Sequence, residues 1–216
     1  MNTHLENQNK LYNEHFQKLQ KEVGRESAGE KAVGGKFDQY GKIELELLNQ
    51  YGLHTQDCIV DVGCGSGRLT KQLALQHEGK YIGTDVVQDL IDHAKSYCRS
   101  EDWKLLKVDE LNIPIESETA DFVCFFSVFT HLLHEQSYLY LKEARRVLKK
   151  RGTIIFSFLE FAVPAHWSIF EGNLSVYEKN HLNMFIDRDA IKAWARYLDL
   201  KIEDIVGGNQ KQIKKP

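Results

Sequence analysis

Residues 58–70 read Cys58-Ile59-Val60-Asp61-Val62-Gly63-Cys64-Gly65-Ser66-Gly67-Arg68-Leu69-Thr70. The run begins with apolar, β-branched residues, turns on three glycines at alternate positions, and continues into a sequence that favours a helix. Because glycine has no Cβ atom, a ligand can lie directly against the backbone N–H groups at the start of that helix. The pattern therefore predicts a strand, a tight loop and a helix that together bind a nucleotide-like ligand.

Two common nucleotide-binding patterns do not fit these residues. The dinucleotide fingerprint G-x-G-x-x-G requires a glycine at position 68, where the chain has Arg68. A phosphate-binding loop requires a lysine followed by serine or threonine at the start of the helix, and neither stands there. What remains is G-x-G-x-G with an acid, Asp61, two residues before Gly63.

This arrangement resembles the first motif of class I S-adenosylmethionine-dependent methyltransferases, in which hydrophobic residues flank an acid just before G-x-G-x-G. The amino group and the sulfonium of S-adenosylmethionine are positive, so a carboxylate beside the loop suits this ligand. The resemblance implies that Gly63, Gly65 and Gly67 shape the loop. It also implies that Asp61 serves the methionine end of the cofactor. A glycine-rich turn without a ligand is the alternative.

Two further acids follow at the ends of predicted strands. Asp85 ends the run 80–85 and Asp109 ends the run 103–109, each 24 residues after the previous acid. Because parallel strands end at one edge of a sheet, the three carboxylates are expected at the same edge. The resemblance implies that Asp85 accepts the ribose hydroxyls and Asp109 the adenine amine, although NAD enzymes share the acid after the second strand. The other predicted cofactor contacts are Cys64, Val86, Val108, Glu110, Ser127 and Val128.

The run 122–128 is almost wholly apolar, as expected for a central parallel strand that is buried on both faces. The resemblance places the end of this strand beside the substrate and the methionine end of the cofactor. His131 follows it and could act there as a general base, or could instead cap the loop or stack on the cofactor. A metal site formed with His134 is not predicted, because no third ligand with suitable spacing appears.

The remaining periodicity predicts helices over 37–51, 87–99, 137–150 and 187–198, a fifth strand over 153–158 and a sixth over 200–206. In the first of these helices, Ile43, Leu47 and Leu48 are expected to face inward. The phrase 146–152 before the fifth strand resembles the family's RVLKPGG without its proline. Together the elements predict an α/β fold with a doubly wound, mostly parallel sheet and a short or missing last strand.

We expect a methyltransferase domain over 37–216 and a separate helical segment over 1–36. Apolar residues recur at helical spacing over 12–23, which predicts an amphipathic helix. That helix could cover a sheet edge or a dimer partner. By resemblance to small-molecule methyltransferases of this size, it could equally be a lid over cofactor and substrate. The glycine-rich stretch 24–36 is expected to be a mobile loop, which could close on the active site or could equally be a plain linker.

The segment 160–183 is rich in aromatic residues and shows no clean periodicity. Aromatic side chains between the fifth strand and the next helix suggest a wall of a substrate pocket, and packing against the N-terminal segment is the alternative. The candidate substrate residues are His166, Trp167, Tyr177 and His181.

The composition limits the classes of protein that need to be considered. With 216 residues, 42% hydrophobic and 27% charged, the chain fits one soluble α/β domain, and its net charge of −3 gives no reason to expect nucleic acid as a partner. The four cysteines form no C-x-x-C pair, which predicts buried free thiols in a reducing compartment. No apolar signal core or membrane-length run appears. We therefore expect a cytoplasmic protein without a membrane partner, either a monomer or a homodimer.

The sequence predicts an S-adenosylmethionine-dependent methyltransferase that releases S-adenosylhomocysteine. The methyl group would pass by in-line displacement to an oxygen or nitrogen of a small molecule. The small substrate is implied by the resemblance of the N-terminal segment and the aromatic insert to small-substrate members of the family. The alternatives are a non-catalytic domain that binds S-adenosylmethionine and an NAD-dependent oxidoreductase, against which Arg68 argues.

Overall fold

The centre of the computed structural model is a five-stranded parallel sheet with the strand order β3-β2-β1-β4-β5. The structure describes residues 3–33, 36–176 and 183–207. The strands are β1 (Ile59–Val62), β2 (Tyr81–Asp85), β3 (Lys104–Lys107), β4 (Ala120–Phe125) and β5 (Leu148–Phe156). The order reverses at β1, where the chain leaves one half of the sheet for the other, and this confirms the predicted doubly wound α/β fold.

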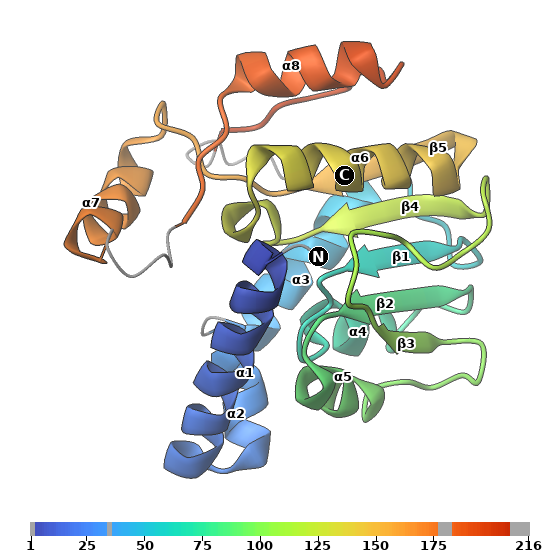
Figure 1. Cartoon of the computed structure of the whole chain (residues 1–216). Coiled ribbons are helices and arrows are strands. Elements are labelled where there is room, and N and C mark those ends of the chain that lie inside the picture. Colours follow the sequence, from blue (N-terminus) through green and yellow to red (C-terminus); the bar gives the residue numbers. More distant parts are fainter. Residues whose placement is uncertain (1–2, 34–35, 177–182, 208–216) are drawn as a thin grey trace.

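Helices cover both faces of the sheet (Figure 1). One face carries α3 (Phe37–Gln50), α4 (Arg68–Leu73) and α5 (Gln88–Lys95), and the other carries α6 (His134–Val147) and α8 (Arg188–Tyr197). The other helical elements are α1 (Thr3–Val23), α2 (Arg25–Ala32), α7 (Trp167–Val176) and the short turns η1 (Phe129–His131) and η2 (Pro164–His166).

The carboxyl ends of the strands lie together at one edge of the sheet (Figure 1). The register pairs Val62 of β1 with Thr84 of β2, and Asp85 of β2 with Lys107 of β3. The segments that leave these strands therefore start side by side. Helices α1 and α2 pack against each other and lie beyond this edge, so that they face the loops which follow the strands (Figure 1).

The prediction of a mobile loop over 24–36 was wrong, because most of this stretch forms α2 (Arg25–Ala32). Gly24 makes the turn from α1 with a φ of 79°, and alanine, glutamate and lysine then favour a helix. Gly29 allows a close contact with α5, since a Cβ atom there would lie 2.5 Å from the ring of His93. Gly24 and Gly29 therefore provide a turn and close packing.

Two predictions near the end of the sheet were also wrong: the start of the fifth strand and the presence of a sixth strand. Helix α6 ends at Val147, and β5 begins directly at Leu148, five residues earlier than the predicted start at 153. Residues 200–206 form no strand. Ile202 and Ile205 instead pack against the core from an irregular segment, since in the described part of the chain no further strand lies beyond β5 to pair with.

The inner face of α3 differs from the prediction at one position. Leu48 is fully buried as expected, but the side chain of Ile43 is 37% exposed. Its neighbour Glu44 is buried instead, because it forms an ion pair with Arg68. A charged side chain can take an interior position when a partner compensates for its lost hydration, and hydrophobic periodicity does not reveal such a pair.

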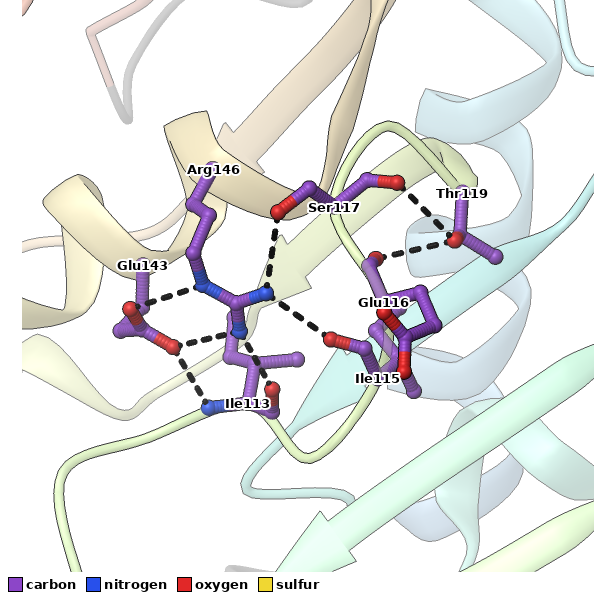
Figure 2. A network of polar contacts seen from close by, with 7 residues as sticks. All are labelled: Ile113, Ile115, Glu116, Ser117, Thr119, Glu143 and Arg146. Atoms are coloured by element: carbon purple, nitrogen blue, oxygen red, sulfur yellow. Dashed lines mark hydrogen bonds and ion pairs between the residues drawn. The ribbon is translucent and has the colours of Figure 1, made fainter.

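The loop from β3 to β4 is fastened to α6 by Arg146 (Figure 2). Its guanidinium donates to the carbonyl oxygens of Ile113 at 2.8 Å and Ile115 at 2.9 Å. It also forms a bidentate ion pair with Glu143, which lowers the pKa of that carboxyl. Glu143 in turn accepts the backbone N–H of Ile113 at 3.2 Å. Donors and acceptors from α6 thus satisfy a loop that has no regular structure of its own.

We expect Arg146→Ala to lower the free energy of unfolding by about 2 kcal/mol, because two loop carbonyls and Glu143 lose their donor. Hydrogen exchange at the Ile113 amide should become faster, and urea unfolding gives the energy. Arg145→Ala is the matched control, since this neighbour on α6 takes no part in the network of Figure 2. Equal losses in the two variants would contradict the role given to Arg146.

Candidate functional site

The glycine loop, residues 63–67, has a backbone geometry that only glycine adopts easily. Gly63, Gly65 and Gly67 have φ angles of 75°, 55° and 92°. A Cβ atom at Gly63 would lie 2.5 Å from Val128, and one at Gly65 would lie 2.6 Å from Val33. The missing Cβ atoms therefore let Val128 and Val33 lie directly against the loop backbone, and residues 64–67 are buried.

Asp85, at the end of β2, is bonded directly to the glycine loop. Its Oδ2 accepts the N–H of Gly65 at 2.9 Å, and its Oδ1 accepts the N–H of Val87 at 2.9 Å. Burial raises the pKa of Asp85, and these backbone hydrogen bonds oppose the increase. Each carboxylate oxygen keeps a further lone pair. The half-buried Asp85 can therefore hold the loop and accept hydroxyl groups of a ligand at the same time.

Asp61 lies beneath the loop rather than on its surface. Asp61 is only 3% exposed, and its carboxylate accepts a hydrogen bond from the hydroxyl of Tyr81 at 2.8 Å. That hydroxyl also lies 2.8 Å from the hydroxyl of Thr70 on α4. Burial raises the pKa of Asp61 to about 7, although the Tyr81 hydrogen bond opposes the increase. The carboxyl group thus titrates near neutral pH inside the domain.

This pKa makes the stability of the fold depend on pH. The folded protein holds the proton of Asp61 more tightly than the unfolded chain, so the free energy of unfolding falls as pH rises from about 4 to about 7. The slope from this group is at most about 1.4 kcal/mol per pH unit. In Asp61→Asn that slope should disappear, which urea unfolding at several pH values would measure. An unchanged slope in Asp61→Asn would mean that other groups cause it.

Arg68, the first residue of α4, ties the glycine loop to the N-terminal helices. Its Nη2 pairs with Glu44 of α3, and its Nη1 donates to the carbonyl oxygen of Val33 at 3.0 Å. Burial raises the pKa of Glu44, and the guanidinium opposes this. The residue that excluded a dinucleotide fingerprint thus has a definite structural role, which is to connect α3 and the end of α2 to the loop.

The predicted contacts after β3 lie farther from the loop than Asp85. Asp109 and Glu110 are exposed, and the carboxylate of Asp109 pairs with Lys107 at 2.5 Å. Val108 is buried, and Val86 packs in an apolar cluster beside α1. Cys64 is buried within the loop. Cys64 therefore lies in the loop and Asp85 is hydrogen-bonded to it, whereas Asp109 follows the end of β3, the next strand outward.

The segment after β4 brings three predicted residues to the same edge. Ser127 has a φ of 60°, and its N–H donates to the hydroxyl of Ser157 at 2.7 Å. Val128 contacts the position of Gly63 in the loop. His131 ends η1, is half-buried, and makes an edge-to-face contact with the ring of Tyr12, with ring centroids 5.4 Å apart. No sequence pattern predicted this contact, because Tyr12 lies on α1, far from His131 along the chain.

The structure describes residues 160–176 and 183 of the aromatic segment 160–183. Trp167 begins α7 and is 49% exposed, and Nδ1 of His166 lies 3.1 Å from both the N and the O of Glu160. Tyr177 and His181 lie outside the described residues. Four rings pack together in what we term the aromatic group, which consists of Phe161, Trp167, Phe170 and Phe185. Phe185 was not predicted, because it lies after the aromatic stretch.

Other expectations can be checked over the ranges that the structure describes. Within them, no group of three or more His, Cys, Asp or Glu side chains is arranged to hold a metal ion. None of the helices found there is long and apolar enough to cross a membrane. The four cysteines are free, and Cys58, Cys64 and Cys124 are buried as predicted, whereas Cys98 is half-buried.

The central part of the chain resembles known methyltransferases. Residues 60–156 match the family described as "Methyltransferase domain". An uncharacterized methyltransferase of Schizosaccharomyces pombe is 27% identical over 120 residues, which are 55% of this chain and 46% of that protein. A ubiquinone biosynthesis O-methyltransferase of Coxiella burnetii is 24% identical over 179 residues, 80% of this chain and 75% of that one. The chain thus spans about half the length of the first of these relatives.

Solved structures share the fold at low sequence identity. Magnesium protoporphyrin IX methyltransferase from Synechocystis, with bound S-adenosylhomocysteine, has a TM-score of 0.60 at 15% identity and covers 80% of this chain and 76% of its own. Geranyl diphosphate methyltransferase in complex with S-adenosylmethionine has a TM-score of 0.58 at 17% identity. That match covers 72% of this chain and 63% of the other. The family match thus identifies residues 60–156 as a methyltransferase domain, and these solved methyltransferases share the fold built on its parallel sheet.

Proposed function

We propose that this protein transfers the methyl group of S-adenosylmethionine to an oxygen or nitrogen atom of a small molecule. The observation that carries the small-molecule part is the position of the aromatic group next to η1. The N–H of Met184 donates to the carbonyl oxygen of Thr130 at 2.8 Å, and Nε2 of His134 lies 2.8 Å from the carbonyl oxygen of Phe185. The backbone that carries Phe185 thus adjoins the segment that carries His131, and the aromatic group would form an apolar wall there.

The cofactor roles follow from where the residues lie. The backbone of the glycine loop would receive the methionine end of S-adenosylmethionine, with the charge of Asp61 beneath it. Asp85 would accept the ribose hydroxyls, since its oxygens already face the loop. Asp109 would reach the adenine amine after leaving Lys107, and Val86 and Val108 would flank the ring. The bound cofactor supplies a methyl group on a sulfonium centre.

The chain's own residues have limited chemistry to perform. His131 would take the proton from a hydroxyl or an ammonium group of the acceptor, through a ring nitrogen. The aromatic group would hold the apolar body of the acceptor in line with the methyl group, and α1 would keep water out. The names of the ubiquinone biosynthesis O-methyltransferase and the magnesium protoporphyrin IX methyltransferase refer to small molecules, which supports a small acceptor here.

The test is a methyl-transfer assay of the purified protein with a panel of phenols, catechols, amines and thiols, which follows the release of S-adenosylhomocysteine. We expect turnover with planar hydroxyl or amino acceptors. Binding of S-adenosylmethionine without turnover on any acceptor would favour the non-catalytic alternative. Methylation of nucleic acid or protein alone would overturn the small-molecule assignment.

A further inference from the structure

The backbone around His131 is fixed from several sides. Its own N–H donates to the carbonyl oxygen of Val128 at 2.9 Å, and the neighbouring carbonyl oxygen of Thr130 accepts from Met184 at 2.8 Å. Phe129, fully buried, contacts Phe125 and Phe156 with ring centroids 4.9 and 5.0 Å away. The position of η1 therefore depends on β4, β5 and the segment after α7.

The direction of the imidazole ring is a separate matter, because a histidine side chain can rotate on a fixed backbone. Here the ring meets Tyr12 of α1 at an interplanar angle of 82°. Edge-to-face pairs of this kind contribute about 0.5–1.5 kcal/mol beyond the area they bury, which is enough to favour one rotamer over another. Tyr12 is thus the part of α1 that bears on the orientation of His131.

Tyr12 is itself held rigidly. It packs in an apolar cluster with Phe16 of α1 and with Val87 and Leu90 beside the end of β2. Burial and the nearby charge of Asp85 raise the pKa of its hydroxyl, so the ring stays a neutral phenol. This also places Tyr12 near the carboxylate that we assign to the ribose.

We propose that Tyr12 is a positioning residue that holds the imidazole of His131 in the orientation required for proton removal. The inference rests on the proposed function, since it deepens the role given there to His131. The base is then assembled from two parts of the chain, with its backbone supplied by the sheet edge and its orientation by α1.

The same helical pair also contacts the glycine loop. The hydroxyl of Ser66 donates to the carbonyl oxygen of Gly29 in α2 at 2.6 Å. Displacement of α1 and α2 would therefore release the loop and the base together. A transfer-competent site exists only while α1 is docked, which links water exclusion to base assembly.

The test compares Tyr12→Leu, Tyr12→Phe and the control Leu19→Ala. Leu19 packs in the same cluster on α1, so its truncation loosens the helix to a similar degree without removing the ring beside His131. The first readout needs no substrate: the imidazole resonances of His131, assigned by a His131→Gln variant, are followed by NMR. Loss of the Tyr12 ring current shifts these resonances by itself, so the His131 χ1 coupling constants are measured as well. We expect Tyr12→Leu to change both the resonances and the couplings, while Tyr12→Phe and Leu19→Ala leave both near their original values.

The second readout is the split between kcat and KM with an accepted substrate. Misplacement of a catalytic group by about 1 Å can cost about 100-fold, so we expect Tyr12→Leu to lose 10- to 100-fold in kcat while KM for the cofactor changes little. Tyr12→Phe should stay within about threefold, because the aromatic contact is retained. Equal kcat losses in Tyr12→Leu and Leu19→Ala would mean that Tyr12 only stabilises α1, and this would overturn the proposal.

Failure of the proposed function has a different signature. A protein without methyl-transfer activity would leave the NMR comparison intact, and a changed His131 χ1 coupling in Tyr12→Leu alone would still establish that Tyr12 orients His131. Conversely, active enzyme with unshifted His131 resonances in Tyr12→Leu would overturn the positioning role and leave the methyl-transfer assignment in place.

Discussion

Asp85→Ala should weaken binding of S-adenosylmethionine by about 100-fold or more, which corresponds to about 2.7 kcal/mol. The carboxylate would accept two ribose hydroxyls, and hydrogen bonds to a charged group contribute about 1.5–3 kcal/mol each. The variant also removes the acceptor of the Gly65 N–H, which lies 2.9 Å from Asp85 Oδ2, so the loop loses part of its support. Calorimetric titration with S-adenosylmethionine and S-adenosylhomocysteine measures the loss directly.

The control is Asp102→Ala, which removes an exposed acid from the turn before β3 and leaves the loop untouched. Its affinity for both ligands should stay within about twofold of the original, since surface substitutions away from a site change energies by about 0.5 kcal/mol or less. Equal affinities in the original protein and Asp85→Ala would remove the ribose role. Titration with NAD belongs in the same experiment. Tight binding of NAD would contradict the interpretation that the glycine loop binds S-adenosylmethionine and not a dinucleotide.

The central fold was predictable because its signals are local. One strand, one turn and the next strand position Asp61, the three glycines and Asp85. Each of these elements can be predicted from residues that are close together in the sequence. The acids were expected at one sheet edge because parallel strands joined by helices end together, whereas their equal spacing alone indicated only the α/β architecture, which the structure confirms. Burial of β4 on both faces was also predictable from a local signal, because the run 122–128 is almost wholly apolar.

What the sequence could not predict depends on contacts between distant segments. The pairing of Tyr12 with His131 joins residues of α1 and η1, and no periodicity encodes it. Stretch 24–36 was misjudged because glycines that serve a turn and a close helix contact look the same in sequence as glycines of a mobile loop. Asp61 was expected to face the ligand, and the structure shows its hydrogen bond to Tyr81, a partner that a strand pattern does not reveal.

The buried ion pair between Arg68 and Glu44 leads to the second large expected effect. The two side chains are 12% and 8% exposed, and their residues join α4 to α3 directly below the glycine loop. Removing one partner leaves the other charge buried and uncompensated, which costs about 3–5 kcal/mol in comparable pairs. Glu44→Leu should reach this range, because a guanidinium cannot lose its proton to escape the penalty.

Arg68→Met should cost less than Glu44→Leu and should depend on pH in a definite direction. The pKa of Glu44 is already raised by burial, and without the guanidinium it should rise further, so at low pH the carboxyl takes up a proton and the penalty shrinks. The double variant Glu44→Leu with Arg68→Met should recover most of the stability, since neither charge then remains. Urea unfolding at pH 5 and pH 8 measures all three.

Lys71→Met is the matched control for this series. Lys71 stands on the same helix and pairs with Asp38 of α3 at 2.8 Å, but their side chains are 34% and 59% exposed. Exposed pairs contribute about 0–1 kcal/mol, so this variant should stay within that range at both pH values. If Glu44→Leu cost no more than Lys71→Met, the pair below the glycine loop would be as dispensable as a surface ion pair. The position of the loop would then not depend on this ion pair.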